Sequence, residues 1–252
     1  MADMMPSKIT LLHDDVTYAM RFAEEFASGG KSNFNFGNAT HVRSAGQLNQ
    51  NALSGKLGEL AFGEFAERFG LKIEYDDEIR EGRNAGDLGN DVVAIEIYGE
   101  RRFLVPSLDV KCTKPYSKWL LVEEHQLRSS IYVLSKASID IDDLEKAYDS
   151  TWPECFDRPR KPIEVEMVGW AFHGDFFNAP GDPKYFYKRG DYLGDTNTQL
   201  SAPNFGLPVD ELRQDWQDLF QTMKATSRIS KYQPNGMVLR HGRYDHEESW
   251  LP

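Results

Sequence analysis

The segment LDVKCTK, running from Leu108 to Lys114, alternates apolar and charged residues over its first four positions. Alternation with a period of two predicts a β-strand, because successive side chains of a strand point to opposite faces. Leu108 and Val110 are then expected to face the core, while Asp109 and Lys111 lie side by side on the other face. A carboxylate beside an ammonium on one strand is a candidate functional site.

The segment NAGDLGND lies upstream of this strand and contains Asp87 and Asp91. It precedes an apolar stretch, residues 92–98, that we predict to be a strand, with residues 102–113 as its antiparallel partner. Such a hairpin brings Asp87 or Asp91 close to Asp109. Convergent carboxylates bind Mg²⁺ or Mn²⁺, which prefer oxygen ligands, so the pattern predicts a metal site and leaves open which of the two upstream aspartates is the ligand.

A third acid is expected on a long helix over about residues 47–69. Apolar residues recur there at helical spacing, and the helix is predicted to stop at Gly70. Glu59 has Gly55 one turn before it and Gly63 one turn after it, so its face of the helix lacks bulky side chains. We therefore expect another group to approach the helix closely beside Glu59.

The remaining elements complete an α/β pattern. Helices are expected over residues 17–27, 144–148 and 209 to about 225, and strands over residues 72–75, 119–122, 131–135 and 163–172. This order predicts a sheet core that ends near Ser150, with an α+β extension packed on it. We expect three segments: 1–46, an N-terminal helix and polar loop; 47–150, the core; and 151–252, the C-terminal extension, which is a second candidate for DNA contacts.

Composition excludes several classes of protein. The chain has 252 residues, of which 40% are hydrophobic and 27% charged, as in globular proteins. No apolar stretch approaches the roughly 18 residues of a membrane span, and the N-terminus lacks signal-peptide features. Two cysteines, Cys112 and Cys155, are too few for a disulfide scaffold. We expect a cytoplasmic protein without a membrane partner, and the absence of GxxxxGK[ST] and GxGxxG motifs argues against a nucleotide cofactor.

Charge is distributed unevenly along the chain. The net charge of −11 taken alone argues against a nucleic-acid partner. However, residues 26–58, 110–122 and 219–244 contain no acid and together carry +11, which predicts one cationic face on an acidic body. Lys224, Arg228 and Lys231 share one helical face if the last helix continues that far. The bases expected to contact DNA are Lys31, Arg43, Lys56, Lys114, Lys118, Lys224, Arg228 and Lys231.

The order of a helix with Glu59, then Asp87, then Asp109-Val110-Lys111 on a hairpin strand resembles the PD-(D/E)xK nuclease superfamily, which includes most type II restriction endonucleases. The resemblance covers about residues 49–135. It implies a restriction-endonuclease-like core, with a central mixed β-sheet flanked by helices. By this resemblance Glu59, Asp87 and Asp109 are the catalytic, metal-binding acids and Lys111 is the catalytic lysine.

One position departs from the pattern that names the family. Gly86 stands where the motif has proline, which keeps Asp91 as a rival to Asp87. The resemblance implies an endonuclease of the type II restriction kind that uses Mg²⁺, for which Mn²⁺ can substitute, and that acts on double-stranded DNA as a homodimer. Two alternatives are a DNA repair or recombination nuclease of the same fold and a catalytically silent nucleic-acid-binding protein.

Overall fold

The computed structural model describes residues 7–28, 45–77, 90–139, 161–194 and 198–229. Three α-helices lie in these ranges: α1 (His13–Ser28), α2 (Ala45–Glu67) and α4 (Trp216–Thr226). The longer strands are β1 (Lys8–Leu11), β2 (Lys72–Tyr75), β3 (Val92–Ile97), β4 (Glu100–Phe103), β5 (Leu108–Thr113), β6 (Trp119–Glu123), β7 (Ile131–Ala137), β8 (Ile163–Phe172) and β12 (Asn204–Pro208). Shorter elements are η1 (Glu124–Gln126), η3 (His173–Phe176), β9 (Phe177–Ala179), β10 (Asp182–Pro183), β11 (Phe186–Tyr187) and η4 (Val209–Glu211).

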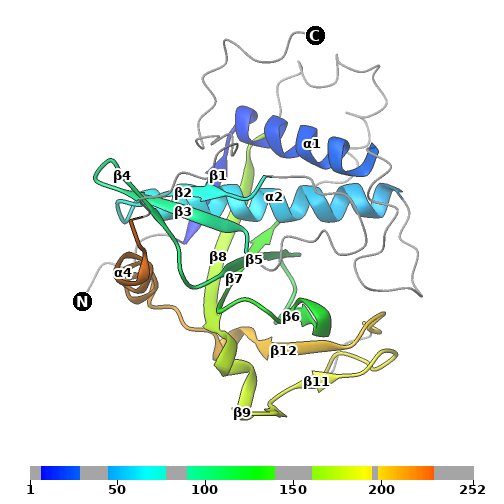
Figure 1. Cartoon of the computed structure of the whole chain (residues 1–252). Helices are drawn as coiled ribbons and strands as arrows, with labels where there is room; N and C mark the ends of the chain where they lie inside the picture. The colour runs from blue at the N-terminus through cyan, green and yellow to red at the C-terminus, as the bar shows by residue number, and fades with distance from the viewer. Residues whose placement is uncertain (1–6, 29–44, 78–89, 140–160, 195–197, 230–252) are drawn as a thin grey trace.

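A mixed four-stranded sheet forms the centre of the molecule, in the order β1-β8-β7-β5. Strands β5 and β7 are parallel, and the other two pairings are antiparallel. Helix α2 runs across one face of this sheet, and α1 packs on α2 (Figure 1). The α/β class and the mixed sheet predicted from the sequence are therefore confirmed.

The strand predicted over residues 102–113 is two strands, so this part of the prediction was wrong. Strand β4 pairs with β3 as expected, but the chain leaves β3 after Leu104 and resumes as β5, which pairs with β7. Pro106 lies in the interruption, and proline has no N–H to donate to a neighbouring strand. One bond, from the Asp91 N–H to the Leu108 carbonyl oxygen (2.8 Å), still joins the start of β5 to the residue before β3.

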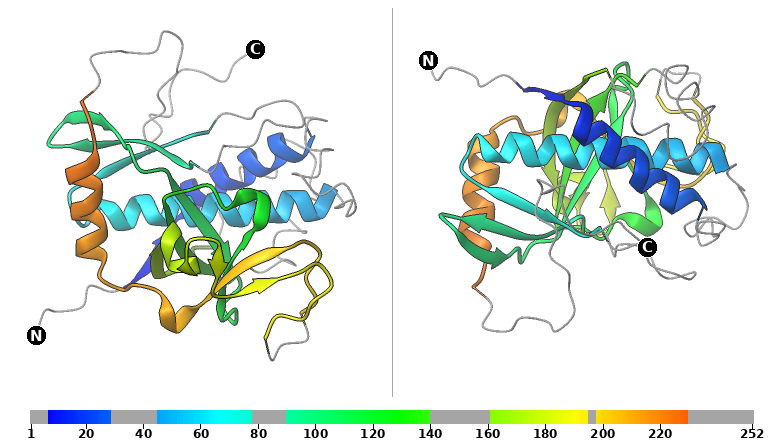
Figure 2. Two further views of the ribbon diagram at one scale, coloured as in Figure 1. Left: turned by 60° about the horizontal axis from the view of Figure 1, so that its bottom comes forward. Right: turned by 90° about the horizontal axis from the view of Figure 1, so that it is seen from above.

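Helix α2 holds the core together because its apolar face is buried against the sheet. Leu57, Phe62 and Phe65 are fully buried there. At Gly58 the helix backbone approaches the sheet so closely that an added Cβ would lie 2.8 Å from the Cβ of Cys112. Helix α4 closes one end of this core, where Phe220 stacks on Phe62 (Figure 2).

The opposite face of the central sheet is covered by a second, smaller sheet in the order β11-β12-β6. Leu120 and Val122 of β6 pack there against Tyr132 and Leu134 of β7. The central sheet also includes β1 from the segment 1–46 and β8 from the segment 151–252. The sequence boundary expected near Ser150 is therefore not a boundary of the sheet.

The last predicted helix also differs from the structure. Residues 209–211 form η4, and α4 begins only at Trp216, because Arg213 instead forms a backbone bridge to Trp170 of β8. The short helix expected over residues 144–148 lies outside the described residues. Among the described helices, none combines the length and the apolar character that crossing a membrane requires.

Candidate active site

Asp109 and Lys111 project from the same face of β5, as their spacing predicts. The Lys111 ammonium lies 2.8 Å from the Asp109 carboxylate. Leu108 and Val110 belong to the core beneath α2, so Asp109 and Lys111 point to the other face, where Asp109 is in register with Tyr132 of β7. Asp109 is only 2% exposed, whereas 28% of the Lys111 side chain is exposed, so the lysine connects a buried carboxylate to solvent.

Asp91 joins this pair from the neighbouring sheet. Its carboxylate accepts a hydrogen bond of 2.6 Å from the backbone N–H of Val110, the residue between Asp109 and Lys111. Asp91 is 8% exposed. We call Asp91, Asp109 and Lys111 the strand cluster. The sequence-based expectation of an upstream aspartate near Asp109 is met by Asp91, while Asp87 lies outside the described residues.

Glu59 belongs to a different group of polar side chains, which we call the helix cluster: Tyr18, Lys56, Glu59 and Asp77. The Lys56 ammonium lies 2.5 Å from the Glu59 carboxylate and 2.8 Å from that of Asp77. Tyr18 of α1 donates a hydrogen bond of 2.6 Å to Asp77. The ring of Phe22, also on α1, lies 4.1 Å from the Lys56 ammonium. Lys56 is thus enclosed by two carboxylates and an aromatic ring.

Electrostatics keep Lys56 of the helix cluster charged. Burial by itself lowers the pKa of Lys56, but the carboxylates of Glu59 and Asp77 outweigh burial and raise that pKa above its usual value. The pKa of Tyr75 is also raised, first by burial and then by the charges of Glu59, Asp77 and Asp91. Tyr75 therefore lies in the field of carboxylates from both clusters and stays protonated.

The glycines around Glu59 have different neighbours. Beside Gly63 the Tyr75 hydroxyl approaches to within 2.9 Å of where a Cβ would be, and this hydroxyl donates to the backbone oxygen of Glu59. Nothing lies within 4 Å of the corresponding position at Gly55. The close approach predicted beside Glu59 thus occurs at Gly63, and the group that approaches is Tyr75.

Of the five predicted DNA-binding bases that the structure describes, three do not form the expected face. Lys56 is 2% exposed, so its assignment to a DNA-contacting surface was wrong. The helix expected to carry Lys224, Arg228 and Lys231 ends at Thr226. Lys224 donates to the Phe69 carbonyl oxygen (2.8 Å), and Arg228 exchanges backbone hydrogen bonds with Phe103, so these two do not share a helical face.

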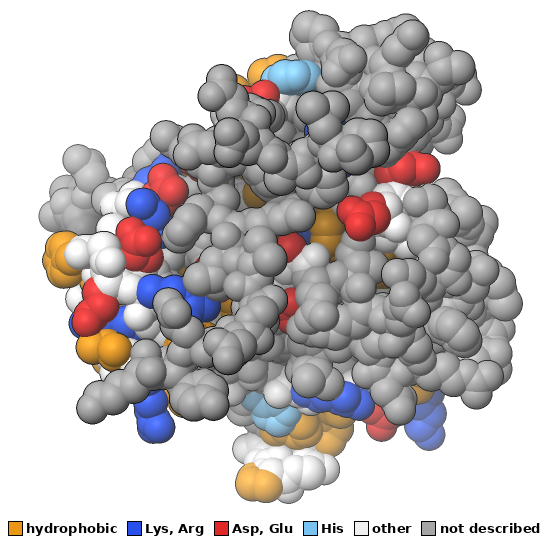
Figure 3. All heavy atoms as spheres, turned by 45° about the horizontal axis from the view of Figure 1, so that its top comes forward, with side chains coloured by type: hydrophobic (Ala, Val, Ile, Leu, Met, Phe, Trp, Pro, Cys, Tyr) orange, Lys and Arg blue, Asp and Glu red, His pale blue; other side chains and the backbone are white. Residues whose placement is uncertain are grey.

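Two of the predicted DNA contacts, Lys114 and Lys118, are exposed. Lys114 directly follows β5, and Lys118 directly precedes β6. Over the β2-β3-β4 sheet, at the left of Figure 3, acidic and basic side chains are mixed. Lys31, Arg43 and Lys231 lie outside the described residues.

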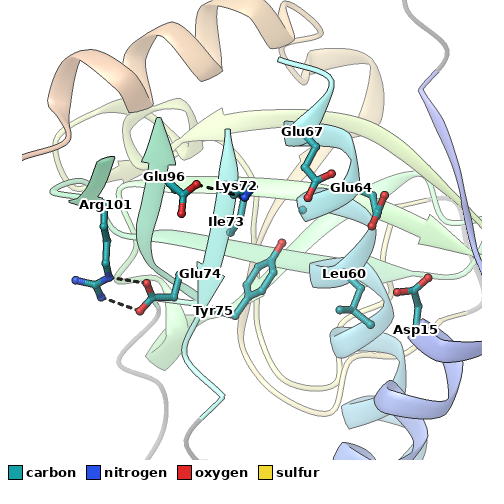
Figure 4. Close-up of a pocket in the computed structure, with 11 residues that line it drawn as sticks. Asp15, Leu60, Glu64, Glu67, Lys72, Ile73, Glu74, Tyr75, Glu96 and Arg101 are labelled. Carbon is teal, nitrogen blue, oxygen red and sulfur yellow. Dashed lines mark hydrogen bonds and ion pairs between the residues drawn. The ribbon is translucent and has the colours of Figure 1, made fainter. Parts of the chain in front are cut away.

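A pocket of about 260 Å³ opens between α2 and β2 (Figure 4). Its carboxylates are partly neutralised, because Glu74 binds Arg101 through two hydrogen bonds of 2.7 Å and Lys72 lies 3.3 Å from Glu96. Tyr75 lines this pocket and also lies beside the helix cluster. The pocket contains neither Asp91 nor Asp109.

The donor atoms of the strand cluster suit a hard cation, since Asp91 and Asp109 supply carboxylate oxygens. Within the ranges that the structure describes, no group of three His, Cys, Asp or Glu side chains is arranged to hold a metal ion. Asp87, which the sequence assigns to the site, is not in those ranges.

Comparison with protein-family models, with curated proteins and with solved structures finds no match for this chain.

Sequence reasoning missed Asp77, Tyr18 and Tyr75. These residues come together through the packing of α1 on α2 and of both helices beside β2, over separations of up to 59 positions. The only local sign of them is the pair Asp76-Asp77 directly after β2, which by itself looks like an ordinary polar end of a strand.

Proposed function

We propose that the chain is a Mg²⁺-dependent DNA endonuclease of the type II restriction kind, built on a PD-(D/E)xK-like core. One observation carries the proposal: the carboxylate of Asp91 binds the backbone N–H between Asp109 and Lys111. Two buried carboxylates and a partly exposed lysine are thereby held together where two sheets meet. Burying two carboxylates costs free energy, and this cost favours the interpretation that they serve a function.

The order of elements supports the proposed fold. Helix α2 with Glu59 precedes the antiparallel strands β2, β3 and β4, and β5 with Asp109 and Lys111 then pairs in parallel with β7. This order agrees with the resemblance, but two features differ from it. Strand β3 belongs to the separate β2-β3-β4 sheet and does not pair with β5, and the chain between β5 and β7 forms β6 and η1 rather than an α-helix.

The proposed chemistry assigns a role to each group. Asp109, together with either Asp91 or Asp87, would hold Mg²⁺, and the resemblance adds Glu59 to this set. The ion would polarise a phosphodiester oxygen and lower the pKa of a bound water. Lys111 would orient the attacking water and stabilise the negative charge that grows on the phosphate. Its partly exposed side chain would contact the substrate, while the ion pair with Asp109 restrains it.

Double-stranded DNA is the proposed substrate. Lys114 and Lys118 lie in the connection between β5 and β6 and would contact phosphates next to the one that is cut. A homodimer is proposed because a palindromic site has a two-fold axis that two copies of one chain can match.

Nicking of supercoiled plasmid DNA by the purified protein tests the proposal. We expect cleavage with Mg²⁺ or Mn²⁺, none with EDTA, and none by Asp109→Asn, which should still bind DNA when Ca²⁺ replaces Mg²⁺. DNA binding without any cleavage by the wild-type protein would instead favour the catalytically silent alternative. Cleavage only at branched or damaged DNA would favour a repair nuclease.

A further inference from the structure

The turn between β5 and β6, residues 114–118 with the sequence KPYSK, presents an aromatic ring to solvent, because Tyr116 is 76% exposed. We propose that this ring stacks on a nucleobase of bound DNA, while Lys114 and Lys118 contact phosphates on either side of it. The inference rests on the proposed function for the choice of DNA as the partner. It adds a residue that contacts a base to two residues that contact the DNA backbone.

Hydrogen bonds hold this turn in one shape. The Ser117 N–H donates to the Lys114 carbonyl oxygen (3.0 Å), which closes the turn, and Pro115 at its second position has a fixed φ. The Ser117 hydroxyl donates to the Trp119 carbonyl oxygen (3.2 Å). The ring of Tyr116 can therefore be fixed on a ligand at a small cost in entropy, because the backbone is already restrained and tyrosine has only two rotatable side-chain bonds.

Both ends of the turn are anchored in β-sheets. Strand β5 belongs to the central sheet and β6 to the smaller one, so the turn connects the two sheets (Figure 1). Trp119, the first residue of β6, packs edge-on against Tyr185 and Tyr187, with ring centroids 5.4 and 5.7 Å apart. Tyr116 is thus exposed directly beside well-packed aromatic residues.

The charges around the ring favour a polyanion. Residues 110–122 contain three lysines and no acid. The Lys114 ammonium lies 6.0 Å from the centre of the Tyr116 ring, so a positive charge and the ring lie on one surface. Across the part of the chain that the structure describes, neither Lys114 nor Lys118 forms an ion pair, unlike Lys111. These two exposed ammoniums are therefore available to phosphates.

The turn is also close to Lys111 along the chain. Five residues separate Lys111 from Tyr116, and they span at most about 18 Å of backbone, or roughly five base steps of 3.4 Å. A base that Tyr116 contacts would therefore belong to the same DNA site as the phosphate that Lys111 would contact.

Tyr98 provides a matched control within the same chain. It is 99% exposed in the turn between β3 and β4. However, the arginines that follow it are already paired, Arg101 with Glu74 and Arg102 with Glu100. An exposed ring beside balanced charges is not expected to contact DNA, so Tyr98→Ala should leave DNA binding unchanged.

DNA affinity of the full chain, measured in Ca²⁺ without Mg²⁺, tests the ring separately from the lysines. Tyr116→Ala should weaken binding by about tenfold, as loss of one base-stacking ring does, and Tyr116→Phe should change it by less than about twofold. The slope of log K against log salt should stay at the wild-type value in both variants, because the ring carries no charge. An affinity of Tyr116→Ala equal to that of the wild type or of Tyr98→Ala would overturn the inference.

Photocrosslinking to 5-iodouracil gives a direct readout of stacking, because irradiated 5-iodouracil couples to an aromatic ring that lies against it. Single-stranded and duplex oligonucleotides that carry 5-iodouracil at successive positions are irradiated in complex with the protein. Mass spectrometry should then locate a crosslink at Tyr116 in at least one of the two kinds of DNA, and none at Tyr98. Absence of a Tyr116 crosslink from both kinds would contradict stacking.

The same variants separate this inference from the proposed function. Wild-type cleavage that depends on Asp109, with unchanged binding and cleavage in Tyr116→Ala, would overturn only the inference. DNA binding that depends on Tyr116, without any cleavage, would support the inference and overturn the endonuclease. A wild-type protein that binds no DNA would overturn both, and binding to vesicles of anionic lipid that is lost in Tyr116→Ala would then assign the turn to a membrane surface instead.

Discussion

The helix cluster and the strand cluster each place a lysine against a carboxylate, yet they differ in how the chain builds them. In the strand cluster, Asp109 and Lys111 are two positions apart, and Asp91, 19 positions before Val110, joins them after the chain has passed through the β3-β4 hairpin. In the helix cluster, Lys56 reaches Asp77, and Asp77 binds Tyr18 across 59 positions. The strand cluster follows from the alternation of side chains along a strand, whereas the helix cluster follows from the packing of helices and strands against one another.

The two lysines also differ in what they can touch. Lys111 is partly exposed and can meet a phosphate, whereas Lys56 is enclosed by Phe22, Glu59 and Asp77. A buried lysine can hold a neighbour in place, and only an exposed one can contact a substrate. The strand cluster therefore suits the proposed chemistry better than the helix cluster does.

The largest effect is expected at Asp91. Asp91→Asn keeps an oxygen that can accept the Val110 N–H but loses the charge, so cleavage should fall by on the order of a thousandfold, equivalent to about 4 kcal/mol in the barrier. Asp87→Asn should cost much less if Asp91 is the ligand. Single-turnover cleavage rates of the two variants decide which aspartate is the metal ligand. A larger loss of rate in Asp87→Asn than in Asp91→Asn would mean that the metal site is not at the strand cluster.

The next effect concerns Lys111. Lys111→Ala should lower kcat by on the order of a hundredfold with little change in DNA affinity, as loss of one electrostatic stabiliser of the transition state does. Lys118→Ala is the control for general loss of positive charge. If Lys111→Ala weakened DNA binding as much as it slowed cleavage, Lys111 would be a phosphate anchor instead.

Substitution of Gly55 and Gly58 tests how closely α2 must approach the central sheet. Gly58→Ala should destabilise the protein by about 1–3 kcal/mol, because its Cβ would lie 2.7 Å from the Ser135 hydroxyl. Gly55→Ala should stabilise it by up to about 1 kcal/mol through helix propensity, because no atom lies within 4 Å. Thermal unfolding of both variants measures the difference, and equal effects would contradict the close approach at Gly58.

DNA affinity tests whether the surface beside the strand cluster faces the duplex. Each lost phosphate contact reduces the slope of log K against log salt by about 0.9, so Lys114→Ala/Lys118→Ala should reduce it by about 1.8. Lys224→Ala should leave the slope unchanged and lower stability, because Lys224 binds the Phe69 carbonyl oxygen. A reduced slope in Lys224→Ala, with an unchanged slope in Lys114→Ala/Lys118→Ala, would instead place the DNA beside α4.

The smallest effect is expected for an ion pair outside both clusters. Burial raises the pKa of Asp175, but Arg213 and the Phe172 N–H outweigh burial and hold this pKa below its usual value. A lowered folded-state pKa stabilises the protein above the unfolded-state value near 3.8, and this stability is lost as pH falls through the folded-state value. Asp175→Asn should therefore cost less than about 1 kcal/mol at pH 7 and less again near pH 3, as measured by urea unfolding.

Much of the fold follows from local patterns. Strands β2 and β8 have the predicted bounds, and β6, β7 and α2 differ from prediction by a few residues at their ends. Two of the errors occurred where tertiary pairing overrides the local pattern. One was the split of β4 from β5 at Pro106, and another was the break before α4, where Arg213 pairs with Trp170 instead of continuing a helix.

The sequence by itself determined that Asp109 and Lys111 share one face of a strand, because side-chain direction in a strand depends only on whether positions are odd or even. It also placed an aspartate near them, because a hairpin returns the chain to its own start. Only the tertiary structure decided that Asp91 binds between Asp109 and Lys111, and that Lys56 is enclosed by Glu59, Asp77 and α1 rather than exposed to DNA. Those contacts depend on the angle and distance at which helices cross a sheet, and these are set by the packing of the whole core rather than by the spacing of residues along the chain.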